Sequence, residues 1–254
     1  MVGGGDMFSK VFIAWKRDYG EKIALRVCAI LREAGIEYAM DEPNDCDLAV
    51  TIGGDGTLFK FQSSLECPIL GINPGDSVGF YLSAGAKDFE RKLKTLLDGD
   101  EGEDYTIKEF PRLETSINKV TVPFLALNDV LISPVYVRRA LEAELNAKGK
   151  RTKEISSGIL VYTPSGSYAY AKAAGAKPMK TNHKFGVAAI APYSGRLARG
   201  ELILEKGQVA VRCLSGEGEV CIDGSEEQVC RLKYRDVVVV KKSARPAKII
   251  FFGK

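Results

Sequence analysis

The sequence predicts an α/β lobe over residues 1–100, followed by a mostly β lobe over residues 101–254. Strand-like and helix-like segments alternate in the first part, whereas short apolar runs bounded by turn residues dominate the second. Between them, the acidic and glycine-containing stretch Asp98–Tyr105 is interpreted as a linker. With 45% hydrophobic residues, the chain can bury a large core.

The first lobe begins with a strand candidate at Lys10–Arg17. Apolar residues at helical spacing over Ile23–Ala34 then predict a helix that ends at Gly35. The next elements are a buried strand in Asp47–Gly54, a helix after Gly56, a strand in Cys67–Gly75 and an amphipathic helix over Lys87–Gly99. This alternation predicts a parallel sheet covered by helices on both faces.

The second lobe contains strand candidates separated by Gly, Pro, Asp or Ser. They are RLETSIN, FLALNDVLIS, SGILVYTP, FGVAAIAP, ELILEKGQVAVRCLSG, EVCIDG, EQVCRL and DVVVVKKS. The segment Val137–Lys148 is ambiguous, because its composition favours a helix while the alternation of Leu141, Ala143 and Leu145 favours a strand. Ala247–Lys254 is a last strand candidate, with a return to the first lobe as one option.

Charge and hydropathy predict neither nucleic-acid binding nor a membrane span. The formal net charge is +3, from 36 basic and 33 acidic residues, which does not predict nucleic-acid binding. No apolar run approaches the roughly 18–20 residues of a membrane span, and no signal segment is recognised, so we expect a cytoplasmic protein. Met1–Asp6 is interpreted as a leader without fold information.

The cysteines and the single histidine suggest no catalytic centre. The six cysteines contain no C-x-x-C pair, which argues against a zinc or redox centre. Buried free thiols are favoured over a hairpin disulfide between Cys221 and Cys230. His183 lies in a polar stretch and is interpreted as a loop residue.

The strongest chemical signal is VTIGGDGTLFK, Val50–Lys60, where glycines join a strand to a helix. Bare backbone N–H groups and the helix dipole at such a turn suit a phosphate. The phosphate-binding candidates are Gly53, Gly54, Gly56, Thr57 and Lys60. The pattern is neither a Walker loop nor a dinucleotide fingerprint. Beside a polyphosphate, Asp55 could position Mg²⁺ or act as a base, although an ordinary turn residue remains an alternative.

GGDGT at Gly53–Thr57 resembles the signature of NAD kinases, and also that of diacylglycerol and sphingosine kinases of the same superfamily. Four further motifs are similar to the NAD kinase pattern and occur in the same order. They are GINPGDSVGFY at Gly71–Tyr81, ALNDV at Ala126–Val130, TPSGSYAY at Thr163–Tyr170 and CIDG at Cys221–Gly224.

This resemblance implies a Rossmann-like first lobe, a β-rich second lobe and an active site in the cleft between them. The implied reaction transfers the γ-phosphate of ATP, or of a polyphosphate, to the 2′-hydroxyl of the adenosine ribose of NAD. Mg²⁺ or Mn²⁺ would assist, and a homodimer or homotetramer is expected. Asp55 would be the catalytic or metal-positioning carboxylate. The substrate-binding positions would be Asn73, Phe80, Asn128, Asp129, Ser157, Ser165, Ser167, Tyr168, Ala169, Tyr170 and Asp223.

Three positions depart from the NAD kinase pattern. Ser157 stands in place of a carboxylate, Tyr168 in place of a threonine, and Asp129 in place of a glutamate. A kinase of the same fold acting on another small hydroxyl compound is therefore an alternative, as is a non-catalytic nucleotide sensor. Ordinary structure is also possible here, since Ser165 or Ser167 could cap a helix and the tyrosines could pack.

Overall fold

The computed structural model describes residues 8–16, 19–43, 45–75, 77, 79–136 and 138–253. Two compact units form: Met1–Glu109 with Ala247–Lys254, and Phe110–Pro246. An α/β unit and a β-rich unit confirm the predicted fold class. The predicted leader Met1–Asp6 lies outside the described residues.

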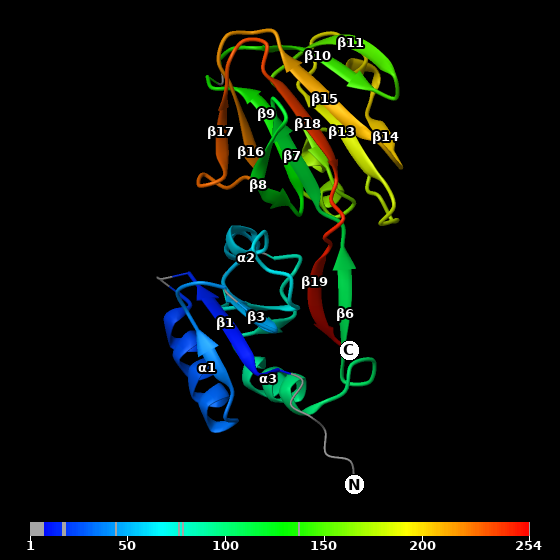
Figure 1. Cartoon of the computed structure of the whole chain (residues 1–254). Coiled ribbons are helices and arrows are strands. Elements are labelled where there is room, and N and C mark those ends of the chain that lie inside the picture. The colour runs from blue at the N-terminus through cyan, green and yellow to red at the C-terminus, as the bar shows by residue number, and fades with distance from the viewer. Residues whose placement is uncertain are drawn as a thin grey trace. The chain divides into compact units, whose positions relative to one another are not determined.

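Unit 1 contains a seven-stranded sheet in the order β2-β1-β3-β4-β19-β6, with β5 paired to β4 (Figure 1). Its strands are β1 Lys10–Trp15, β2 Glu37–Ala39, β3 Leu48–Ile52, β4 Ile69–Asn73, β5 Ala84–Gly85, β6 Tyr105–Phe110 and β19 Ala247–Phe252. The pairs β1–β2, β1–β3, β3–β4, β4–β5 and β4–β19 are parallel.

Helices cover both faces of this sheet. Buried residues of α1 (Glu21–Glu33) and α3 (Phe89–Asp98) share one core with Val11 and Ile13. Phe12 points to the opposite face because side chains alternate along a strand, and its ring meets Phe61 of α2 (Asp55–Phe61) at 5.4 Å.

The predicted boundary at residue 100 is too early. Glu101 bridges to Tyr105, and β6 then pairs with β19 in the sheet of unit 1, so Asp98–Tyr105 is a turn within that unit. The short strands β2 and β5 and the strand β6 were not expected, because their sequences carry little alternation of apolar residues.

Unit 2 consists of two six-stranded antiparallel sheets (Figure 1). The first has the order β11-β10-β15-β18-β7-β8, made of β7 Leu113–Ile117, β8 Val120–Ala126, β10 Leu141–Ala147, β11 Lys150–Ser156, β15 Gln208–Cys213 and β18 Val237–Lys242. The second has the order β14-β13-β12-β9-β16-β17, made of β9 Asp129–Pro134, β12 Gly158–Tyr162, β13 Phe185–Ile190, β14 Leu202–Leu204, β16 Gly218–Ile222 and β17 Val229–Leu232.

The sheets of unit 2 share one apolar core, to which both contribute alternate residues. The ambiguous segment is resolved as β10, since Leu141, Ala143 and Leu145 face this core. A smaller cluster joins Leu160 and Tyr162 of β12 to Ala171 of α4 (Tyr170–Ala173). Burial on both faces explains why β12 is a continuous apolar run. The 3₁₀ turns are η1 Gly166–Tyr168 and η2 Leu197–Arg199.

All six cysteines lie in the described part of the chain and are free thiols. Cys221 is paired with Val229, and Cys230 with Val220, so Cys221 and Cys230 project from opposite faces of their hairpin. Within the described ranges, no helix is long and apolar enough to cross a membrane.

Candidate functional site

The glycine loop leaves β3 at the carboxyl edge of the unit 1 sheet. Ile52, the last residue of β3, is in register with Trp15 and Ile72 in the neighbouring parallel strands. The segments that begin at Lys16, Gly53 and Asn73 therefore emerge side by side. This edge is the usual ligand-binding edge of open α/β sheets.

Gly53 and Gly56 of the loop differ in the space around them. A Cβ at Gly53 would overlap the hydroxyl of Thr57, so glycine is required there by packing. A Cβ at Gly56 would meet nothing within 4 Å, which leaves open space above the backbone of this loop. The packing of the described residues does not explain Gly56, whereas the close approach of a ligand would.

Asp55 joins the glycine loop to the segment at Gly79–Tyr81. Its Oδ2 accepts a hydrogen bond from the backbone N–H of Phe80 at 2.7 Å, and its Oδ1 accepts one from Tyr81 at 3.1 Å. A Cβ at Gly79 would lie 2.9 Å from Asp55 Oδ1. Two motifs 25 residues apart in the sequence are thus held together by one carboxylate.

A cavity of about 990 Å³ opens over this loop within unit 1. The residues that line it include Gly54, Asp55, Gly56, Thr57 and Lys60 from the loop and α2, together with Trp15, Lys16, Met40 and Asp41. Two lysines and two aspartates therefore face a space large enough for a nucleotide. Burial raises the pKa of Asp55, and the two backbone hydrogen bonds oppose that increase.

Asn73 shapes the neighbouring turn. Its Oδ1 accepts hydrogen bonds from the N–H groups of Gly75 at 2.9 Å and Ser77 at 3.3 Å, and its amide donates to Ser77 O at 2.6 Å. Asn73 is therefore a residue that positions the turn beside the cavity. Phe80, by contrast, is 52% exposed and forms an edge-on contact with Tyr81, with ring centroids 5.1 Å apart.

In unit 2, Asp223 organises the Asn128–Asp129 turn. Its carboxylate accepts three backbone hydrogen bonds, from Leu127 at 2.8 Å, Asn128 at 2.7 Å and Asp129 at 3.0 Å. Asp223 itself has a φ of 50°, a conformation that Asp tolerates better than most residues. The late D-G motif thus fixes the backbone of the N-D motif.

The TPSGS turn packs on the same backbone. The hydroxyls of Thr163 and Ser165 both donate to Leu127 O, at 2.6 and 3.2 Å. A Cβ at Gly166 would overlap the carbonyl oxygen of Asn128. Ser167 is fully buried and its hydroxyl donates to Pro164 O at 2.6 Å. Both hydroxyls thus make hydrogen bonds that hold this turn in place, and the substrate role that the family resemblance implies for Ser165 and Ser167 stays a prediction.

Two buried carboxyls lie close together here. Burial, and secondarily the charge of Asp223, raises the pKa of Asp129 to about 7. Burial raises the pKa of Asp223 to about 6, despite its three backbone donors. Asp129 is only 5% exposed, so ionising it carries a desolvation cost.

The remaining predicted contacts lie at the surface of unit 2. Tyr168 and Tyr170 are 47% and 46% exposed, and Ala169 between them is also exposed. Ser157 is exposed as well, at the start of β12, where its N–H donates to Ile190 O at 2.8 Å. These side chains are placed where a ligand could reach them, unlike Ser165 and Ser167.

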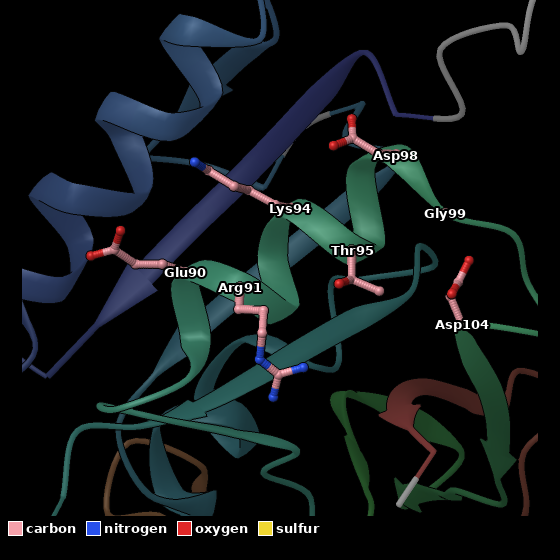
Figure 2. A pocket seen from close by; sticks show the side chains of 7 residues that line it. All are labelled: Glu90, Arg91, Lys94, Thr95, Asp98, Gly99 and Asp104. Atoms are coloured by element: carbon pink, nitrogen blue, oxygen red, sulfur yellow. The ribbon is translucent and has the colours of Figure 1, made fainter.

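A second hollow, of about 630 Å³, lies along α3. Figure 2 shows that the charged ends of Arg91 and Lys94 point in different directions rather than toward one point. Glu90 is engaged by Arg26 at 3.0 Å. None of the predicted site residues lines this hollow, so the cavity at Asp55 is the better candidate.

Asp55 is the carboxylate of the glycine loop that could help to hold a metal ion. Among the described residues, no three His, Cys, Asp or Glu side chains form a group that could hold a metal ion. Each oxygen of Asp55 accepts one hydrogen bond, which leaves lone pairs available. This donor set fits Mg²⁺ that arrives with a polyphosphate, because Mg²⁺ commonly uses one or two carboxylates plus phosphates and water.

Sequence reasoning missed Trp15, Lys16 and Asp41, which line the same cavity as Asp55. The available signal was the position of Trp15 and Lys16 at the carboxyl end of a predicted parallel strand. Thr163 was also missed as a functional hydroxyl, and its bond to Leu127 O had no local signal because 36 residues separate the two.

Family comparisons cover most of the chain. The ATP-NAD kinase N-terminal domain matches residues 36–101, and the ATP-NAD kinase C-terminal domain matches residues 127–252. The chain is 31% identical over 226 residues to the NAD kinase of Methanothermobacter thermautotrophicus, covering 86% of this chain and 76% of that protein. It is 30% identical over 217 residues to the NAD kinase of Azotobacter vinelandii, covering 81% and 70%.

Solved structures share the fold. The NAD kinase from Archaeoglobus fulgidus in complex with ATP superimposes with a TM-score of 0.76 at 24% identity, covering 96% of this chain and 93% of that one. The yeast NADH kinase complexed with NADH gives 0.84 at 17% identity, covering 97% and 84%.

Proposed function

Because this chain belongs to the ATP-NAD kinase family, we propose that it transfers the γ-phosphate of ATP to the 2′-hydroxyl of the adenosine ribose of NAD, giving NADP. The observation that carries this proposal is the position of Asp55, within an open glycine loop that lines a nucleotide-sized cavity with two lysines.

The donor is proposed to bind with its phosphates over Gly54, Gly56 and Thr57. Backbone N–H groups of the loop and the ammonium groups of Lys16 and Lys60 supply the complementary charge. Mg²⁺, or Mn²⁺ in its place, would neutralise the phosphate oxygens, and positioning of this metal ion by Asp55 is the alternative to its role as a base.

Asp55 is proposed as the general base. The proton of the acceptor hydroxyl passes to a carboxylate oxygen of Asp55 while the hydroxyl oxygen attacks the γ-phosphorus and ADP leaves. A carboxylate whose pKa is raised by burial is a stronger base than a solvated one, and the N–H groups of Phe80 and Tyr81 keep its orientation fixed.

The acceptor is proposed to use residues of unit 2. Asn128 and Asp129 lie on a backbone fixed by Asp223 and by the Thr163–Gly166 turn, and they are the candidates to hold the adenosine part. Ser157, Tyr168, Ala169 and Tyr170 are exposed candidates for further contacts. The family match favours NAD over another small hydroxyl acceptor and over a non-catalytic sensor.

An acceptor screen tests this function. The protein is incubated with ATP and Mg²⁺ and with NAD, NADH, nucleosides, sugars or polyols, and both ADP release and NADP formation are measured. We expect ADP release that depends on NAD and equals the NADP formed. Release with a sugar or nucleoside but not with NAD would overturn the acceptor, and no release with any acceptor would overturn the kinase assignment.

Assembly is a further part of the proposal. The family resemblance implies a homodimer or homotetramer, and light scattering after size-exclusion chromatography distinguishes these from a 27.6 kDa monomer.

A further inference from the structure

Two thiols outside the Asp55 cavity lie in contact at the amino ends of β3 and β4. The Sγ atoms of Cys46 and Cys67 are 3.2 Å apart, although the residues are separated by 21 positions in the sequence. Cys67 is 9% exposed, whereas Cys46 is half-buried. Cys46 is thus the more exposed residue of the pair.

The sheet holds both cysteines in place. Asp47, next to Cys46, accepts hydrogen bonds of 2.7 Å from the N–H and the hydroxyl of Ser9 and donates its own N–H to Lys10 O at 3.0 Å. Pro68, next to Cys67, accepts a bond of 2.9 Å from Ala49 N. The thiol contact is therefore built into the pairing of β3 with its neighbours.

We propose that Cys46 and Cys67 are a redox-active pair that closes to an intramolecular disulfide in the presence of a small-molecule disulfide. Shortening the 3.2 Å contact to the length of an S–S bond requires a movement of about 1 Å. No sequence pattern indicates this pair, because it is the parallel pairing of β3 with β4 that brings the two residues together.

The reaction proceeds by two thiol–disulfide exchanges. The Cys46 thiolate attacks one sulfur of the external disulfide, which breaks its S–S bond and releases one thiolate. The Cys67 sulfur then attacks Cys46 Sγ, forming the internal disulfide and releasing the second external thiolate. Two protein thiols are oxidised, one external disulfide is reduced to two thiols, and the two protons go to these thiols.

The order of attack follows from exposure. Burial raises the pKa of the Cys67 thiol, with its hydrogen bond to Cys46 as the second cause, so Cys67 is disfavoured as the thiol that attacks an external reagent. Cys46, which is half-buried, is the thiol that an external reagent reaches first.

Closing this bond would cross-link the segment that contains the phosphate-binding loop. Residues 46–67 include β3, Gly53–Thr57 and α2. A disulfide across a loop of this length restricts the unfolded chain and should raise the thermal midpoint of unfolding by roughly 6–12 °C.

Peptide mapping tests the pair directly. Trypsin cleaves after Arg32, Lys60 and Lys87, so Cys46 and Cys67 fall on separate peptides, residues 33–60 and 61–87, with one cysteine each. The folded full-length protein is treated with oxidised glutathione, alkylated, digested without reductant and analysed by mass spectrometry.

We expect the two peptides to be linked, two hydrogens lighter than their sum, and separated by dithiothreitol. The link should be absent in Cys46→Ser and present in the control Cys230→Ser. The thermal midpoint should rise on oxidation in the wild type but not in Cys46→Ser. Recovery of separate peptides, with Cys46 alkylated or carrying only glutathione, would overturn the proposal.

Discussion

The carboxylate of Asp223 accepts a 2.7 Å hydrogen bond from the backbone N–H of Asn128, across 95 residues of sequence. Together with the bonds from Leu127 and Asp129, it ties the end of β16 to the start of β9. A buried carboxylate with three backbone donors fixes the local backbone more strongly than side-chain packing alone.

Replacing Asp223 with Asn should destabilise the protein by about 1–3 kcal/mol, because one carboxylate oxygen becomes an NH₂ group that cannot accept from a backbone N–H. Urea unfolding measures the change. Glu219→Gln, on β16 just before Asp223 and in an ion pair with exposed Arg231, is the control and should cost less than about 1 kcal/mol. Equal stabilities for the two variants would contradict the role of Asp223.

The raised pKa of Asp129 predicts a specific pH dependence of stability. In the native protein the pKa of Asp129 is raised to about 7, whereas the ordinary value of an Asp side chain is 3.8. Between these pH values the unfolded state has lost the proton and the native state has kept it, so the free energy of unfolding falls as pH rises from about 4 to 7.

Asp129→Asn removes this contribution. The stability of the variant relative to wild type should therefore increase between pH 4 and pH 8, by on the order of 4 kcal/mol, since each unit of pKa difference corresponds to about 1.4 kcal/mol. Chemical unfolding of both proteins across this range measures the difference. Parallel stability curves for the two proteins would show that Asp129 titrates normally.

Two glycine-to-alanine changes should have opposite effects. Gly166→Ala places a methyl group on the Asn128 carbonyl oxygen and should destabilise unit 2 by about 3 kcal/mol or more. Gly56→Ala meets open space and lies within α2, so stability should be unchanged or rise by up to about 1 kcal/mol.

The activity of Gly56→Ala tests whether phosphates bind at this position. If phosphates bind over Gly56, the methyl group of Gly56→Ala obstructs them, and the KM for ATP should rise although the thermal midpoint does not fall. Wild-type kinetics in Gly56→Ala would argue against phosphate binding at this position.

Asp55→Asn tests the proposed base. The amide cannot take the proton, so kcat should fall by roughly 10²–10⁴-fold. Glu90→Gln, an exposed carboxylate on α3, should leave kcat near the wild-type value. Circular dichroism and thermal unfolding establish that Asp55→Asn remains folded, and an unchanged kcat would remove Asp55 from the mechanism.

The pH–rate profile adds an independent measurement on Asp55. Since burial raises the pKa of Asp55 above the ordinary Asp value of 3.8, the loss of kcat/KM on acidification should begin above the ordinary Asp range. Activity should increase with pH through that limb, because the ionised form is the base. The same limb should disappear from the residual activity of Asp55→Asn.

The sequence alone determined the order of strands and helices around the glycine loop, because local periodicity and turn residues encode them. It also determined which motifs mark the family. The alternation of Leu141, Ala143 and Leu145 favoured a strand, but its pairing with β11 and β15 is what decided against a helix.

Only the tertiary structure shows which side chains hold the backbone through hydrogen bonds and which line the cavity. Ser167 looked like a substrate contact but is consumed inside its own turn, whereas Lys16 looked like an ordinary strand end but lines the cavity. The contacts Asp55–Phe80, Asp223–Asn128 and Cys46–Cys67 join residues 21 to 95 positions apart. No local pattern specifies such contacts, since strand pairing and burial create them only when the chain has folded.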